Sequence, residues 1–179
     1  MKHTIFLKMF GSFILVIIAF TCLLLLFSLS TIKNFYLDTI AHDLENLGEA
    51  LKLKVIPYLD NNELKELDFF VKKFGTDIHT RITVIDGEGL VLADSDEHPA
   101  VMNNHKFGPE IVTAYQGKTG RTLRFSNTVG ADMLYIGLPI ERNGILSEVL
   151  RVSLYVEDID RLYGGLRSNI WRIIILLSL

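Results

Sequence analysis

The sequence predicts an α+β protein in which a long N-terminal helix leads into a five-stranded antiparallel sheet. Two transmembrane helices are expected to flank this domain, and the second of them is truncated. Three observations support this fold class. All 21 acidic residues lie between Asp38 and Asp160, whereas both ends are apolar. Helical spacing of apolar residues dominates the segment before residue 80. Short β-rich segments separated by turn residues follow it.

The charge distribution separates a soluble middle from the two apolar ends. Residues 33–167 hold 15 of the 18 Lys and Arg residues and all 21 Asp and Glu residues, a net charge of −6. The whole chain carries a net charge of −3. A nucleic-acid-binding protein shows a basic face, so this balance argues against nucleic acid as a partner.

The first apolar segment, residues 9–32, is predicted to be a transmembrane helix. Its uncharged residues would span about 36 Å, enough to cross a hydrocarbon core of about 30 Å. Lys2 and Lys8 precede the segment and place residues 1–8 in the cytoplasm by the positive-inside rule. A signal peptide cleaved near Ser30 is the alternative, although the apolar run exceeds the usual length of about 7–15 residues.

The last segment, residues 169–179, is predicted to begin a second transmembrane helix. Trp171 takes the place of an interfacial anchor, and the residues after Arg172 provide only about 10 Å of helix. We therefore expect the sequence to be a fragment of a longer protein. An apolar tail that docks on the domain is the alternative. Two spans with a cytoplasmic N-terminus place residues 33–168 outside the cytoplasm of a bacterial cell.

Two helices are expected before the sheet. The first carries an apolar stripe and is predicted to end near Pro57, because proline disrupts a helix interior. The stripe faces either the domain itself or a partner subunit, and we expect a homodimer. The second helix is predicted to begin at an N-cap at Asn61 or Asn62 and to stop at Gly75. The stripe consists of Leu37, Ile40, Leu44, Leu47, Leu51 and Val55.

The sheet is predicted to begin with a hairpin. Residues 81–85 and 90–93 flank an Asp-Gly-Glu-Gly turn, and a short helix is expected later, over residues 110–116. Asn143-Gly144 is typical of a two-residue turn between the last two strands, and Pro139 indicates an edge position or a bulge. The last three strands are predicted at residues 121–128, 132–141 and 145–156.

A closing helix is predicted to start at Asp158, a favourable N-cap, and to run toward the membrane. The last strand leads directly into it, so a change in the packing of the sheet can rotate or slide this helix. The residues expected to relay a signal are Ile159, Leu162, Leu166 and Ile170.

This order of helices and strands is a PAS-like layout, and four pieces of sequence strengthen the likeness. They are residues 83–95 (TVIDGEGLVLADS), 102–105 (MNNH), 109–110 (PE) and 132–140 (DMLYIGLPI). In this order they resemble the extracytoplasmic PAS-like (single-Cache) sensor region of phosphate-regulon-type sensor histidine kinases. Asn103 stands where that family commonly has Glu, and Gly108 where it commonly has Arg. The ligand contacts that this Glu and this Arg make in relatives are therefore not expected at Asn103 and Gly108.

The resemblance implies a signal-input region that relays an extracytoplasmic stimulus to a missing cytoplasmic kinase. ATP, Mg²⁺ and a response regulator would act only on that missing part. The chain itself is expected to be neither an enzyme nor a cofactor-binding protein, since it has no P-loop and no CxxC or HExxH spacing. The alternatives are the sensor region of a chemoreceptor or cyclase, and a module that binds membrane or cell-wall components.

Two groups of residues are candidates for a binding site. Arg121 and Arg124 with Tyr135 would suit a carboxylate or phosphate ligand, whereas the alternative is the solvent face of a strand. An acidic, His-containing segment would suit a divalent cation or a titrating switch, whereas the alternative is a solvated loop in which Asp94 and Ser95 cap a turn. No metal site is asserted, because the spacing lacks an EF-hand continuation. That segment contains Asp94, Ser95, Asp96, Glu97, His98 and His105.

Overall fold

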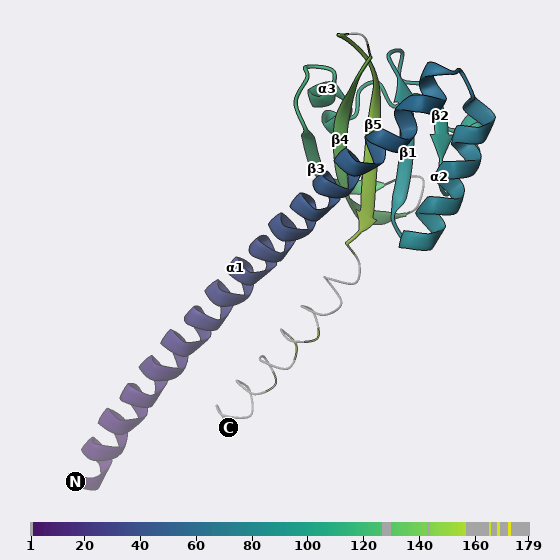
Figure 1. The fold of residues 1–179 in the computed structure, drawn as a ribbon. Helices are drawn as coiled ribbons and strands as arrows, with labels where there is room; N and C mark the ends of the chain where they lie inside the picture. Colours follow the sequence, from purple (N-terminus) through teal and green to yellow (C-terminus); the bar gives the residue numbers. More distant parts are fainter. Residues whose placement is uncertain are drawn as a thin grey trace. The chain divides into compact units, whose positions relative to one another are not determined.

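Three helices, one short 3₁₀ turn and five strands make up the described part of the chain in the computed structural model (Figure 1). The structure describes residues 2–126, 130–142 and 144–156, together with the single positions 165, 168 and 172. Residues 39–157 form one compact unit, and residues 1–38 and 158–179 belong to a second one. The predicted second span, residues 169–179, and the four predicted relay residues lie outside the described residues, except for the single position 172.

The first helix, α1 (Lys2–Asp60), includes the first predicted span. Its most apolar 18-residue window has a mean hydropathy of 2.8, and none of that window is buried. Among the described residues it is the one helix long and apolar enough to cross a membrane.

The helix α1 was predicted to end near Pro57, but proline is not the stop, because the helix continues through that residue to Asp60. Proline removes one backbone donor but leaves its own carbonyl free, and that oxygen accepts a hydrogen bond from the Asn61 amide at 3.1 Å. The helix ends one turn later, where Asn62 adopts a left-handed conformation with φ 56°. The Asn61-Asn62 pair therefore closes α1, and Glu63 occupies the N-cap position of the next helix.

The second helix, α2 (Leu64–Ile78), passes through Gly75 and ends at His79, so the predicted stop at Gly75 is also wrong. His79 has φ 54° and takes the left-handed C-cap position that glycine usually fills. Gly75 has a packing role instead, since a Cβ there would lie 2.4 Å from the Cβ of Ser95.

The five strands form one antiparallel sheet in the order β2-β1-β5-β4-β3, which confirms the predicted fold class. The helix α3 lies between β2 and β3, where a helical excursion was expected. A two-residue connection joins β4 to β5, although Asn143 itself lies outside the described residues. The bounds are β1 Arg81–Asp86, β2 Val91–Asp94, η1 Pro99–Val101, α3 Pro109–Ala114, β3 Gly120–Ser126, β4 Ala131–Arg142 and β5 Ile145–Tyr155.

Pro139 lies in β4 at a place where proline causes little disruption. The pairing of β3 with β4 ends at Gly137, so Pro139 has a neighbouring strand on only one side. Its carbonyl accepts a hydrogen bond from Lys52 Nζ at 3.2 Å, and the register of β4 shifts just beyond it, after Ile140. The expected edge position is thus confirmed locally, since β3 does not extend past Gly137, and the bulge lies after Ile140 rather than at Pro139 itself.

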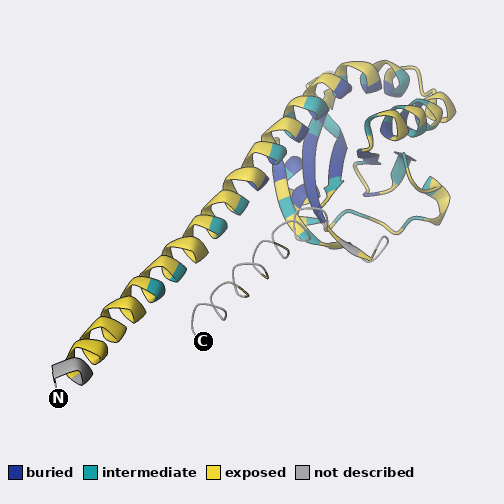
Figure 2. Cartoon of the chain, turned by 90° about the horizontal axis from the view of Figure 1, so that it is seen from below, coloured by how far each residue is buried: buried dark blue, intermediate teal, exposed yellow. Residues whose placement is uncertain are grey.

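The apolar stripe of α1 packs on one face of the sheet over residues 44–55. Leu44, Leu51 and Val55 are buried, and Figure 2 shows these turns buried on one side only. A Cβ on Gly48 would lie 2.1 Å from Leu138 Cδ1 and 2.9 Å from Val152 Cγ2, so the helix backbone lies very close to the sheet. Of the two interpretations of the stripe, packing within the domain holds for this segment.

The packing of α1 can be tested with two leucines on the same helix. Leu51 is 2% exposed and Leu53 is 74% exposed. We expect Leu51→Ala to lower the free energy of unfolding by about 2–5 kcal/mol, because it leaves a cavity between helix and sheet. Leu53→Ala should change it by less than about 0.5 kcal/mol. Unfolding of the full chain in nanodiscs, followed by circular dichroism, measures both. Equal losses would contradict the observed orientation of α1.

Candidate functional site

Polar side chains gather on the face of the sheet opposite α1. Residues alternate between the two faces of a strand, so the neighbours of the α1-facing Leu150 and Val152 point the other way. Register pairs place Arg151 beside Thr83 of β1 and Ser153 beside Tyr135 of β4. Polar groups from three strands therefore meet on one face, and all four of these side chains are buried.

The segment between η1 and α3 adds further polar groups to this face and is tied to the β1–β2 hairpin. The His105 amide donates to the Gly89 carbonyl at 2.8 Å, and the Asn104 side-chain amide donates to the Glu88 carbonyl at 2.8 Å. Gly89 has φ 84°, and a Cβ there would lie 2.5 Å from the Lys106 amide nitrogen. Only glycine permits this close approach, which holds His105 over the sheet.

A cavity of about 180 Å³ lies among these groups. A second cavity of about 170 Å³ shares Asn103 and His105 with it and is lined further by Glu97, Val101 and Met102. Two small compartments therefore meet at Asn103 and His105. The first cavity is lined by Arg81, Asn103, His105, Arg124, Ser126, Tyr135 and Arg151.

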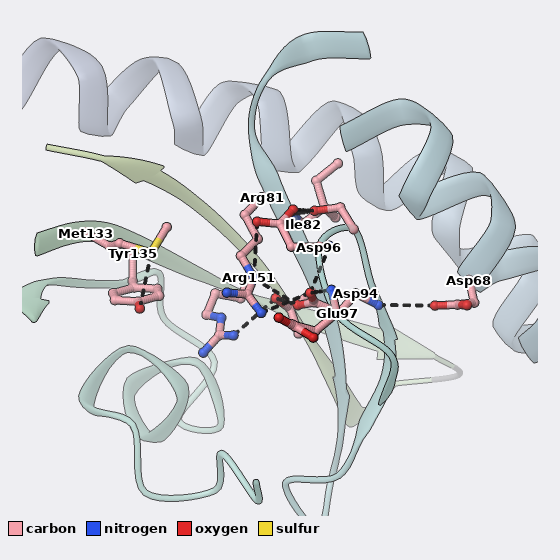
Figure 3. A network of polar contacts seen from close by, with 11 residues as sticks. Asp68, Arg81, Ile82, Asp94, Asp96, Glu97, Met133, Tyr135 and Arg151 are labelled. Carbon is pink, nitrogen blue, oxygen red and sulfur yellow. Dashed lines mark hydrogen bonds and ion pairs between the residues drawn. The ribbon is translucent and has the colours of Figure 1, made fainter. Parts of the chain in front are cut away.

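Arg81 and Asp94 form a buried ion pair at one end of the group (Figure 3). Asp94 accepts from Arg81 Nε at 3.2 Å, from Arg81 Nη2 at 3.0 Å and from Thr83 Oγ1 at 2.7 Å. It also accepts from the amides of Asp96 and Glu97 at 3.0 and 2.9 Å, so it caps the following turn. Burial alone would lower the pKa of Arg81, but the hydrogen bonds and charge of Asp94 raise it overall.

Glu110 provides the second buried carboxylate, from the first turn of α3. Its Oε1 lies 3.0 Å from Arg124 Nη2 and 3.6 Å from Arg151 Nη1. Two glycines make room for it, because a Cβ on Gly120 or Gly137 would lie 2.1 or 2.7 Å from the Glu110 carbonyl oxygen. The Glu110 side chain is fully buried, so its charge must be neutralised by these arginines.

Two guanidinium groups lie close to the ring of Tyr135. The Arg124 guanidinium carbon is 4.3 Å from the centre of the ring and that of Arg151 is 5.1 Å away, both within cation–π range. Burial lowers the pKa of Arg151, and the neighbouring Glu110 charge opposes this change.

Several buried polar atoms at the site have no hydrogen-bond partner among the described residues. Native proteins pair most such atoms, so unpaired donors that face a cavity are a feature of a binding site. The unpaired atoms are Arg124 Nε, Arg151 Nε, Glu110 Oε2, His105 Nε2 and Ser153 Oγ.

The structure brings together only some of the predicted ligand-binding residues. Arg124, Tyr135 and His105 line the cavity, and Asp94 is bonded to its wall through Arg81. Arg121 lies on the other face of β3, because it is three residues from Arg124 and strand side chains alternate with a period of two.

The remaining predicted residues have local structural roles. Ser95 Oγ accepts from the Ile82 amide and donates to Asp96. His98 Nδ1 accepts from the Ala100 amide at 3.2 Å and caps η1. The part of the chain that the structure describes holds no group of three or more His, Cys, Asp or Glu side chains placed to bind a metal ion.

Sequence reasoning missed Arg81, Glu110 and Arg151. Arg81 and Arg151 stand inside apolar strands, and a charged residue at a position predicted to be buried is a usable signal. Nothing in the sequence indicates Glu110 as a site residue, because its place depends on the contact of α3 with Gly120 and Gly137.

No protein-family model and no curated protein matches the chain. Solved structures do match it. The sensor domain of the Vibrio cholerae histidine kinase DctB is 16% identical with a TM-score of 0.58, over 72% of this chain and 52% of that one. The ligand-binding domain of the Campylobacter jejuni chemoreceptor Tlp3, in complex with 4-methylisoleucine, is 17% identical with a TM-score of 0.55, over 75% and 56%. A domain of a sensory box/GGDEF family protein from Vibrio parahaemolyticus is 13% identical with a TM-score of 0.56, over 75% and 60%.

These comparisons concern the fold. The chain spans between 52% and 60% of the length of these three structures, at identities of 13–17%. It has the Cache/PAS-like fold of sensor domains. The histidine kinase, the chemoreceptor and the GGDEF protein differ in their signalling class while sharing this fold.

The Arg81–Asp94 pair is expected to be the main polar contribution to stability at the site. Asp94→Asn leaves Arg81 buried without its counter-charge and should lower the free energy of unfolding by about 3–5 kcal/mol. The matched variant is Asp96→Asn, whose side chain is 36% exposed and 3.9 Å from Arg81, and it should cost less than about 1 kcal/mol. Urea unfolding of the full chain in nanodiscs measures the difference, and similar losses for the two variants would refute this assignment.

The stability of the domain is expected to depend on pH through His105. Burial, followed by the charge of Arg151 and more weakly Arg124, lowers the pKa of His105 from 6.5 to about 4, although Asp94 and Glu110 raise it. Between pH 6.5 and 4 the unfolded chain then binds more protons at this residue, so stability falls as the pH is lowered through that range. His105→Asn should reduce the loss by about 1–2 kcal/mol, after discounting for partial exposure. Unfolding midpoints at pH 7 and pH 4.5 test this, and equal losses in wild type and variant would contradict it.

Proposed function

We propose that the chain is the sensory input region of a membrane-anchored signalling protein, and that the cavity beside Arg124 and Arg151 binds a small anion. One observation carries the ligand assignment: Arg124 and Arg151 line a small polar cavity, and their Nε donors are buried and have no partner among the described residues. Arginine favours carboxylate and phosphate groups because its planar fork matches two acceptor oxygens. The Cache/PAS-like fold supports the sensory role.

The proposed topology is that of a two-pass bacterial membrane protein. Residues 1–8 are cytoplasmic, residues 9–32 cross the membrane, residues 33–168 are extracytoplasmic, and residues 169–179 begin the second span. The apolar character and length of α1 support the first span. The charged composition of residues 33–167 supports an aqueous location for the domain.

We further propose a sensor histidine kinase of the phosphate-regulon type as the parent protein. It would act as a homodimer and pass its signal to a response regulator through a cytoplasmic kinase that uses ATP and Mg²⁺. The sequence pieces at residues 83–95, 102–105, 109–110 and 132–140 support this assignment. A chemoreceptor or a cyclase is the alternative, since structural neighbours include a chemoreceptor and a GGDEF protein.

A module that binds membrane or cell-wall components is the second candidate function. A groove of about 560 Å³ at the C-terminal end of α1 and along α2 favours it. Phe69 is exposed there, and Lys65 and Lys73 flank the groove. The arginine cavity favours the anion sensor, because its polar groups are buried and unpaired whereas those of the groove are open to water.

The anion site can be tested with two arginines of the same strand. Arg124→Gln removes a cavity donor and should weaken anion binding about 10- to 100-fold, the effect of losing a charge-assisted hydrogen bond of about 1.5–3 kcal/mol. Arg121→Gln removes the same charge from the opposite face and should leave affinity within about twofold.

Isothermal titration calorimetry on the full chain in nanodiscs, with acetate, lactate, malonate, phosphate and sulfate as probes, measures both effects. Binding of none of these anions to the wild-type chain, or equal losses in both variants, would overturn the proposal.

A further inference from the structure

The charged groups around the cavity do not balance. Three guanidinium groups, from Arg81, Arg124 and Arg151, meet only two buried carboxylates, those of Asp94 and Glu110. The side chains of Arg81 and Arg151 are each 3% exposed, and that of Arg124 is 34% exposed. A single positive charge therefore remains at the cavity wall, and water compensates it only in part, through Arg124.

Among the residues that the structure describes, two titratable neighbours, Asp96 and His105, do not remove this excess. The carboxylate of Asp96 lies 3.9 Å from Arg81 Nε, but its partial exposure to water weakens the interaction. His105 is neutral at pH 7 because burial lowers its pKa to about 4.

The two carboxylates are used differently. Asp94 bonds through both oxygens, to Arg81, to Thr83 and to two backbone amides. Glu110 contacts the arginines through Oε1 alone, while its Oε2 and the Nε atoms of Arg124 and Arg151 remain unpaired. Glu110 thus leaves a large part of the donor capacity of Arg124 and Arg151 available to another acceptor.

Glu110 is also held in place. The glycines at positions 120 and 137 let the backbone of α3 rest directly on β3 and β4, with no side chain between them. Glu110 lies in the first turn of a helix that Pro109 initiates, and its side chain is held by the ion pairs with Arg124 and Arg151. Its charge therefore lies at a fixed place directly behind Arg124 and Arg151 of the cavity wall.

We propose that Glu110 makes this cavity selective for monoanions over dianions of the same shape. This inference rests on the proposed anion site and names the charge class of its ligand. A monoanion neutralises the residual positive charge, whereas a dianion brings one negative charge that no buried cation balances. The volume of about 180 Å³ suits a small carboxylate, since it equals roughly six water molecules at about 30 Å³ each.

The test compares malonate with malonamate, which have closely similar size and shape and differ by one charge. At pH 7.5 and constant ionic strength, calorimetry on the full chain in nanodiscs gives both affinities. We expect wild-type protein to bind malonamate at least about tenfold more tightly. In Glu110→Gln the residual charge rises by one, and the preference should reverse in favour of malonate. The change in the ratio between variants is the readout, so any difference intrinsic to the amide group cancels.

A charge-restoring variant guards against a purely structural effect of Glu110. The double variant Glu110→Gln/Arg124→Gln again has one excess positive charge and should return the ratio to the wild-type side. Arg124→Gln alone has no excess positive charge and should lose most of its affinity for malonamate. This single variant keeps the proposal testable if Glu110→Gln fails to fold. Arg121→Gln, on the opposite face, should leave the ratio unchanged.

The outcomes separate the two proposals. Binding of both probes with a preference for malonate in wild type, or a ratio unaffected by Glu110→Gln, would overturn the selectivity and leave the anion site standing. Failure of both probes to bind any of the variants would overturn the anion site itself. Reversal in Glu110→Gln and recovery in the double variant would support the inference.

Discussion

The burial of the Arg81 and Arg151 guanidinium groups on one face of a sheet, with the partly exposed Arg124 beside them, is the constraint on which the rest of this structure depends. Each buried guanidinium needs acceptors that water supplies poorly there, and the chain provides carboxylates from outside the sheet's middle strands. Asp94 comes from the end of the edge strand β2, and Glu110 comes from α3. The glycines at 120 and 137 are needed because α3 must approach the sheet closely enough for Glu110 to reach two arginines.

The opposite face of the sheet provides apolar burial, which offsets the free-energy cost of burying these polar groups. Residues 44–55 of α1 pack on the sheet, and Gly48 allows close contact with Leu138 of β4 and with Val152 of β5, the strand that also carries Arg151. β5 shows both functions in consecutive residues, since Val152 faces the helix while Arg151 faces the cavity. Both faces of β1 and β5 are buried, so these strands alternate apolar residues that face the helix with polar residues that face the cavity, and neither set is exposed to water.

Element types could be predicted from the sequence because they depend on local periodicity, whereas their ends and the site depend on tertiary contacts. The helix ends at Pro57 and Gly75 were misjudged because packing on the sheet outweighs the local signal of proline and glycine. The alternation of strand residues already places Arg121 and Arg124 on opposite faces, so the sequence itself argues against grouping Arg121 with the cavity residues. The meeting of Arg81, Glu110 and Arg151 was not predictable, because it requires the strand order and the glycine contacts.

The central position of β5 connects the proposed ligand site with the proposed signalling role. A strand paired on both sides moves only with its neighbours, so a ligand that draws the Arg151 guanidinium away from Thr83 and Glu110 acts on the whole central sheet. Val152, the next residue, contacts α1 at Gly48 without an intervening side chain. Binding shifts a conformational equilibrium only by the difference in its affinity for the two states. Tight packing at Gly48 makes such a difference possible, because a small displacement of β5 cannot be absorbed by side-chain rearrangement at that contact.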